Sequence, residues 1–322
     1  MERTVPRLSL ALFGGFDITL DGQPLVGLKS DKVRALLAYL AVEATRTHRR
    51  ETLAGLLWPE SADVAAFNSL RNALANLRQA LGDAHAASPF LLITRDAIRL
   101  NPDADCWLDV TEFARCMTQS DRRSSNLQSA IPLYRGPFLA GVSVNSAPFE
   151  EWALYRREQF QRQASLALRK LTTHHAERGE HALAQGYARQ QLVLEPFDED
   201  AQRQLMRALA AGGQRNAALA QYEACRRLLA AELRIEPARE TIALYEAIRD
   251  GALDKVTRWE GDKVTASSPV TASPPHRVTP SPFVAREAEL ARLNDHLAAV
   301  LGGQGRAVFV TGDAGSGKTA LV

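Results

Sequence analysis

Amide and guanidinium side chains recur at helical spacing between residues 68 and 79. Asn68, Asn72, Asn76 and Gln79 fall on one side of a predicted helix, because residues three and four apart share a helix face. In the DNA major groove an Asn or Gln amide pairs with adenine, and an Arg, here Arg71, pairs with guanine. The pattern predicts a base-reading surface, although a solvated helix face that lacks acids would show the same residues.

Basic residues accompany this helix. Residues 26–80 hold eight Lys/Arg against five Asp/Glu, a local excess of three positive charges. Any one of them is more often a solvated charge, but together they suit contacts to DNA phosphates. The candidates are Lys29, Lys32 and Arg34 at the start of the first predicted helix, Arg46, His48, Arg49 and Arg50 before the second, Arg78 on the shoulder of the third, and Arg95 at a hairpin tip.

A phosphate-binding pattern lies close to the last residue. Gly312 to Thr319 reads GDAGSGKT after the apolar run 307–311, which fits a loop whose backbone cradles phosphates. Within it Lys318 would reach the terminal phosphates and Thr319 would bind Mg²⁺, with Gly312, Gly315 and Gly317 shaping the loop. Only three residues follow, so we expect no cofactor for this chain, and ATP with Mg²⁺ only in a longer parent protein.

No arrangement typical of an enzyme or a metal site accompanies these patterns. His174, His175 and His181 lie close in sequence without a partner at ligand spacing, so surface histidines are expected. The three cysteines, Cys106, Cys116 and Cys225, form no CxxC pair. We therefore expect no catalytic residue, no metal and no enzymatic activity.

The elements that must position the base-reading helix can be predicted from residue periodicity. Two short strands over residues 7–20 meet at Asp21-Gly22, and Ser30 caps a helix running to about Val42. A short helix over 49–57 precedes a third one that Ser61 or Asp63 can cap, with Phe67, Leu70, Leu74, Leu77 and Leu81 facing inward and Gly82 ending it. Residues 90–94 and 97–100 then form a hairpin, which completes a winged helix-turn-helix preceded by a sheet.

The chain beyond residue 105 is predicted to be helical and repetitive. Ala182–Gln185 recurs unchanged as Ala218–Gln221, 36 residues later, and glycine-containing turns separate the helices. Such a period is typical of tetratricopeptide-like hairpins. The fold class is therefore mainly α with a small β component, followed by an incomplete P-loop α/β fragment. We predict domains at 1–105 (winged helix), 106–253 (helical repeats) and 283–322 (P-loop fragment), with a proline-rich linker at 254–282.

Composition adds only broad limits. The 322 residues carry 39 Lys/Arg and 37 Asp/Glu, so the net charge of +2 neither announces nor excludes a nucleic-acid partner. No apolar stretch approaches the roughly 18 residues that a membrane span needs. A cytoplasmic protein with no membrane partner is expected.

The sequence resembles the Streptomyces antibiotic regulatory proteins (SARP type), which join an OmpR-type winged helix to a bacterial transcriptional activator domain. The resemblance covers about residues 7–249, and the segment 283–287 with the phosphate loop looks like the start of an AAA/STAND ATPase module. The phrases that carry it are Leu56–Pro59, Leu70–Asn72, Leu77–Gly82, Tyr134–Leu139, Phe149–Trp152 and Ala217–Glu223.

The resemblance implies a sequence-specific transcriptional activator that binds double-stranded DNA at promoter repeats. The loop at about 58–65, with Trp58, Glu60 and Asp63, would contact RNA polymerase. The helical domain would serve self-association on DNA or receive an effector. Two alternatives stay open: a signalling ATPase fragment of STAND type whose first 250 residues are a protein-interaction scaffold, and a helical-repeat adaptor whose winged helix no longer binds DNA.

Overall fold

The structure, a computed structural model, describes residues 7–83, 86, 88–118 and 124–252. The predicted linker and P-loop fragment, with Gly312, Gly315, Gly317, Lys318 and Thr319, lie outside the described residues. None of the described helices is long and apolar enough to cross a membrane.

The chain begins with a small sheet. Strands β1 (Leu8–Ala11), β2 (Asp17–Leu20) and β3 (Gln23–Pro24) pair antiparallel. Asp21 and Gly22 both have positive φ, 51° and 78°, which is the two-residue hairpin geometry that this pair predicts. A fourth strand, β7 (Cys106–Leu108), pairs parallel to β1 on its free side. The predicted boundary at residue 105 therefore falls just before a strand that joins the first sheet.

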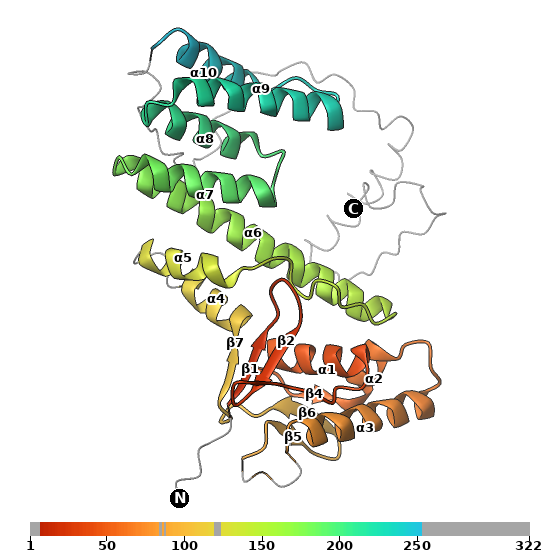
Figure 1. Cartoon of the computed structure of the whole chain (residues 1–322). Coiled ribbons are helices and arrows are strands. Elements are labelled where there is room, and N and C mark those ends of the chain that lie inside the picture. The colour runs from red at the N-terminus through yellow and green to blue at the C-terminus, as the bar shows by residue number, and fades with distance from the viewer. Residues whose placement is uncertain (1–6, 84–85, 87, 119–123, 253–322) are drawn as a thin grey trace, which may run out of the picture. The chain divides into compact units, whose positions relative to one another are not determined.

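Three helices and a hairpin follow the first three strands, as predicted (Figure 1). Helix α1 (Asp31–Val42) is capped by Ser30, whose hydroxyl accepts from the Val33 amide. Helix α2 (Arg50–Leu57) and helix α3 (Asp63–Ala80) pack on α1. Strand β4 (His48–Arg49) pairs with β6 (Ala97–Leu100), which pairs with β5 (Leu91–Ile93). This arrangement confirms the winged helix-turn-helix.

The helical part follows β7. It consists of α4 (Asp109–Thr118), α5 (Ser124–Ala130), the short 3₁₀ helix η2 (Ile131–Leu133), α6 (Ala147–Glu177), α7 (His181–Leu194), α8 (Glu199–Ala211), α9 (Arg215–Glu232) and α10 (Arg239–Arg249). From α6 onward successive helices pack on one another as stacked hairpins. The predicted repeat architecture is thus confirmed.

The structural period of the repeat is 34 residues rather than 36. Helix α7 begins at His181 and α9 at Arg215, 34 residues later, and the turn glycines Gly179 and Gly213 share positive φ at the same offset. Buried residues follow this offset too, with Ala184 and Ala188 matched by Ala218 and Tyr222. The identical Ala-Leu-Ala-Gln phrases, 36 apart, are therefore shifted by two residues and do not occupy equivalent positions.

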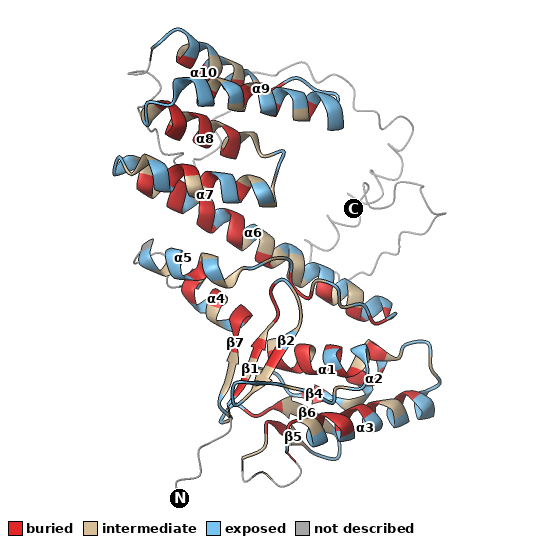
Figure 2. Ribbon diagram, viewed as in Figure 1, coloured by how far each residue is buried: buried red, intermediate tan, exposed pale blue. Residues whose placement is uncertain are grey.

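One hydrophobic core runs through the winged helix and into the helical part (Figure 2). Phe13, at the end of β1, lies 5.3 Å from Phe113 of α4 and 5.2 Å from Phe160 of α6, ring centre to ring centre. A separate cluster holds α8, α9 and α10 together. The base-reading helix is thus mounted on a unit that includes the first helices of the repeat domain.

Candidate nucleic-acid interface

Helix α3 presents most of the predicted base-reading residues to solvent. Asn68, Arg71, Asn72 and Gln79 are exposed, as is Arg78 beside them. Their spacing of three and four places them along one face. The opposite face is buried through Leu70, Leu74 and Leu77, as predicted, and Gly82 with φ of 72° follows the helix end.

Asn76 does not belong to this surface, so its predicted base-reading role is wrong. Only 8% of it is exposed. Its Oδ1 accepts from the Lys29 amide at 3.0 Å, and its Nδ2 donates to the Gly27 carbonyl at 2.9 Å. The amide therefore fixes the segment before α1 onto α3, and both of its hydrogen-bonding ends are already used.

Phe67 also departs from the prediction. It was expected in the buried stripe, but 37% of it is exposed, and Ala66 is buried instead. The helix is rotated so that small side chains, Ala66 and Ala73, approach the core. Val64, one turn before Asn68, is 76% exposed.

The predicted backbone-contacting residues divide into two groups. Lys29, Arg49 and Arg95 are exposed, as is Arg46, and Arg95 lies at the tip of the β5–β6 hairpin, where a wing contact requires it. Lys32 is held with its ammonium 5.5 Å from the centre of the Trp58 ring, a cation–π geometry.

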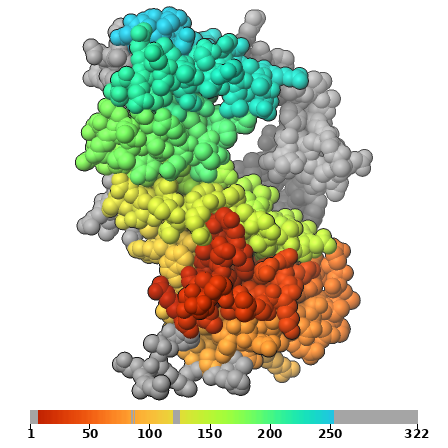
Figure 3. Space-filling view, in the orientation of Figure 1, coloured from red at the N-terminus to blue at the C-terminus, as the bar shows by residue number. Residues whose placement is uncertain are grey.

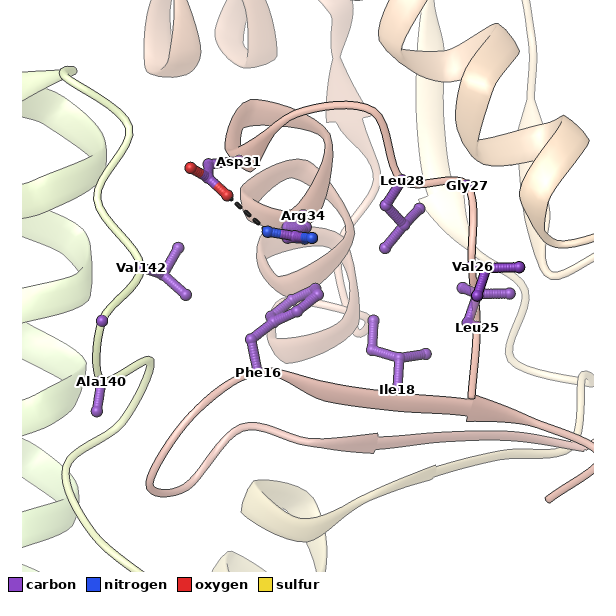
Figure 4. Close-up of a pocket in the computed structure, with 11 residues that line it drawn as sticks. Phe16, Ile18, Leu25, Val26, Gly27, Leu28, Asp31, Arg34, Ala140 and Val142 are labelled. Carbon is purple, nitrogen blue, oxygen red and sulfur yellow. Dashed lines mark hydrogen bonds and ion pairs between the residues drawn. The ribbon is translucent and has the colours of Figure 1, made fainter. Parts of the chain in front are cut away.

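Three of the predicted contacts are engaged inside the protein. Arg34 pairs with Asp31 at 2.8 Å and lines a pocket that includes no residue of α3. Figure 4 shows this pair between α1, β2 and residues 140–142. Arg50 donates to the Thr94 carbonyl at 2.9 Å and so ties α2 to the hairpin. His48 is buried, with its ring 5.1 Å from Tyr39. The phosphate roles predicted for Arg34, Arg50 and His48 are therefore wrong in this geometry.

The loop between α2 and α3 leaves its acidic residues free. Glu60 and Asp63 are exposed, whereas Trp58 is half-buried under Lys32. Neither Ser61 nor Asp63 caps α3: the helix begins after Ala62, without a side-chain cap. The two carboxylates remain available to a partner.

A buried carboxylate that sequence reasoning missed joins the winged helix to the long helix α6. Glu43, at the end of α1, is 8% exposed. It accepts from the Trp152 indole at 2.9 Å and forms an ion pair with Arg156. Burial alone would raise the pKa of Glu43, but the hydrogen bonds from Trp152 and Arg156 outweigh burial and hold that pKa below its usual value.

A second missed carboxylate lies at the start of α4. Asp109 is 1% exposed and accepts from the backbone amides of Leu12, Phe13 and Val110 at 2.8 to 3.0 Å. Arg135, from the Tyr134–Leu139 phrase, lies 3.5 Å from it. Burial raises the pKa of Asp109, against the lowering effect of these partners. In the space-filling view the first strands lie directly against the helical segment that carries these residues (Figure 3).

The predicted surface position of the histidines is wrong for His175. It is 4% exposed, its Nδ1 lies 2.5 Å from Glu180 Oε2, and its Nε2 lies 2.9 Å from the Gln128 amide nitrogen. Among the described residues no group of three His, Cys, Asp or Glu could hold a metal ion. Cys225 is buried, and burial raises the pKa of its thiol to about 11, so it is protonated at neutral pH.

The fold and the exposed face of α3 define a winged helix-turn-helix protein with an attached helical-repeat domain. Residues 108–249 match the model of the bacterial transcriptional activator domain, and residues 282–322 match that of the AAA ATPase domain. The chain is a regulator of the SARP type in its domain composition.

Curated relatives support this assignment. The chain is 28% identical to the regulatory protein AfsR of Streptomyces coelicolor over 94% of its own length and 30% of that protein. It is 25% identical to the transcriptional regulatory protein MoaR1 of Mycobacterium tuberculosis, over 80% of this chain and 86% of that one. The chain thus spans about a third of AfsR and most of MoaR1.

A solved structure shows the same fold. Mycobacterium tuberculosis EmbR, in complex with a low-affinity phosphopeptide, is similar with a TM-score of 0.59 and 25% identity. The match covers 78% of this chain and 68% of that one.

Proposed function

We propose that this chain is a sequence-specific DNA-binding transcription regulator that lays α3 in the major groove. The observation that carries the proposal is the exposed face of α3, where Asn68, Arg71, Asn72 and Gln79 stand together. No carboxylate lies between Val64 and Gly82 to repel phosphates. The hairpin tip at Arg95 suits the adjacent backbone, and the relatives that match most of this chain carry the names of transcriptional regulators.

Replacing Arg71 or Asn72 with alanine is expected to weaken binding to the preferred DNA by about fivefold to a hundredfold, the worth of one bidentate base contact. Binding to unrelated DNA should change far less, because phosphate contacts dominate it. The measurement is a gel-shift titration of the full chain against promoter fragments near its own gene at several salt concentrations. Matched controls are Arg189→Ala and Asn216→Ala, exposed residues of α7 and α9.

The buried amide provides an internal contrast. Asn76→Ala removes the hydrogen bonds to Lys29 and Gly27, so it should lower stability and reduce affinity for all sequences alike. The proposal fails if no salt-sensitive, sequence-preferring complex forms, or if the Arg71 and Asn72 variants bind like the parent. In that event the winged helix is a protein-interaction surface, as the adaptor alternative requires.

We further propose that the 58–65 loop contacts RNA polymerase. Glu60 and Asp63 are exposed there and make no recorded ion pair within the described chain. Glu60→Ala combined with Asp63→Ala should leave DNA affinity within about twofold, since rim charges that miss the DNA contribute little, yet reduce activated transcription. Transcription in vitro on the preferred promoter measures this, and unchanged activation would remove the loop from the proposal.

The remaining parts of the chain have roles that follow from this function. Promoter repeats would place several copies side by side, and the α7–α10 stack would mediate their self-association or receive an effector. The AAA match at 282–322 keeps a signalling ATPase as the alternative for a longer protein. A Mg-ATP titration of the chain, compared with Lys318→Ala, separates the two: binding that depends on Lys318 favours the ATPase.

A further inference from the structure

Two apolar side chains extend the exposed face of α3 toward its first residue. Val64 is 76% exposed and Phe67 is 37% exposed, and neither belongs to a described core cluster. Val64 lies four residues before Asn68, so the two share a face. A single exposed valine needs no explanation. A valine and a phenylalanine next to the base-reading amides do, because they continue that surface.

The charge of this face favours nucleic acid as the occupant. Arg71 and Arg78 are exposed along it, and the helix carries no carboxylate after Asp63. In the major groove the apolar group that each base pair can offer is the 5-methyl of thymine. Apolar side chains beside amides therefore complement an A·T pair, which presents the adenine N6 and N7 together with that methyl.

We propose that Val64 and Phe67 read thymine methyl groups next to the adenines read by Asn68 and Asn72, so that the preferred operator has an A·T core. This inference rests on the proposed DNA-binding function and specifies its target. Arg71 then reads a guanine at the border of that core.

Helix geometry fixes the spacing of these contacts. The four residues from Val64 to Asn68 advance about 6 Å along the helix axis. Base pairs are about 3.4 Å apart. The thymine that Val64 touches therefore lies within two base pairs of the adenine that Asn68 reads.

The test uses the full chain and a duplex selected by it from a random-sequence pool. Each thymine is replaced singly by deoxyuridine, which removes only the methyl, and each adenine by 7-deazaadenine, which removes the N7 acceptor. One or two thymines should show a threefold to fivefold weaker Kd on losing the methyl, about the worth of one buried carbon. A 7-deazaadenine within two base pairs should also weaken binding.

A double-mutant comparison assigns the methyl to its side chain. Val64→Ala should weaken binding to the thymine duplex by the same factor and bind the thymine and uracil duplexes equally. Phe67→Ala should do the same at a second thymine. Val193→Ala, a 79% exposed valine of α7, is the matched control and should keep the full response to the methyl.

Each other outcome has a distinct meaning. If a sequence-preferring complex forms but no thymine responds to methyl removal, the A·T inference is wrong and the DNA-binding proposal stands. The same holds if Val64→Ala and Phe67→Ala leave DNA affinity unchanged and reduce only polymerase-dependent transcription. If the pool yields no preferred duplex, the proposed function itself fails.

Discussion

Replacing Asp109 with alanine is expected to lower the free energy of unfolding by about 3–5 kcal/mol, because three buried backbone amides lose their acceptor. Those amides belong to Leu12, Phe13 and Val110, and the carboxylate that satisfies them is 1% exposed. Urea denaturation of the full chain measures the change. Asp109→Asn, which keeps one carbonyl oxygen, should fall between the parent and the alanine variant.

A neighbouring aspartate provides the control. Asp105 has a 53% exposed side chain and lies 4.0 Å from Arg7. Asp105→Ala should cost only about 0–1 kcal/mol, as exposed ion pairs usually do. If the two alanine variants lose similar stability, Asp109 is not the connection between β1 and α4 that its contacts indicate.

Replacing Glu43 with alanine is expected to cost a similar amount, about 3–5 kcal/mol, since it breaks a buried ion pair by removing one partner. Arg156, with 25% of its side chain exposed, would be left without its carboxylate, and the Trp152 indole would lose its acceptor. Glu51, exposed on α2, is the control: Glu51→Ala should change stability by less than about 0.5 kcal/mol.

The loss at Glu43 should depend on pH in a defined direction. The partners of Glu43 hold its pKa below the ordinary value of 4.5. A carboxyl with a lowered pKa in the folded state contributes stability above its unfolded pKa and loses it as the pH falls through the folded pKa. Glu43→Gln should therefore be less stable than the parent at neutral pH and should converge with it below pH 4.5. A difference that is constant with pH would show that the charge of Glu43 does not matter.

Asp109 should not contribute to this acid loss. Its pKa is raised by burial, and a raised carboxyl pKa contributes stability that is present at low pH and declines as the pH rises through the folded value. The two buried carboxylates thus respond to pH with opposite sign.

Local patterns were sufficient to predict the secondary structure of the winged helix. Ser30 caps α1, Asp21-Gly22 forms the first turn, and Gly82 follows α3, because each effect acts within one turn of chain. The stacked hairpins were predicted for the same reason. The 34-residue offset was not, because an identical phrase at 36 residues obscured the true register.

Long-range pairings could not be predicted from such patterns. Strand β7 pairs with β1 across about a hundred residues of chain, and Glu43 meets Arg156 113 residues later. Nothing near Asp109 in sequence indicates that the amides of Leu12 and Phe13 will reach it. These contacts depend on how whole elements pack.

The candidate site was predicted in its central residues and missed at its margins. Asn68, Arg71, Asn72 and Gln79 lie where helical spacing places them. Asn76 sits at the side of the same face, and only the approach of Gly27 and Lys29 distinguishes a structural amide from a base-reading one. Phe67 was assigned to the core by its type, although alanines occupy that position.

The parallel strand β7 has a consequence for exchange of this winged helix between proteins. A fragment ending at residue 105 would leave the outer backbone of β1 unpaired, with Leu8 and Leu10 beside it. An uncovered apolar edge of this kind recruits further strands and drives aggregation. Gene fusions that move the DNA-binding part alone would thus be selected against unless the cut falls after Leu139, whose amide also bonds Leu12. The recombination unit in this lineage is therefore longer than the helix-turn-helix itself.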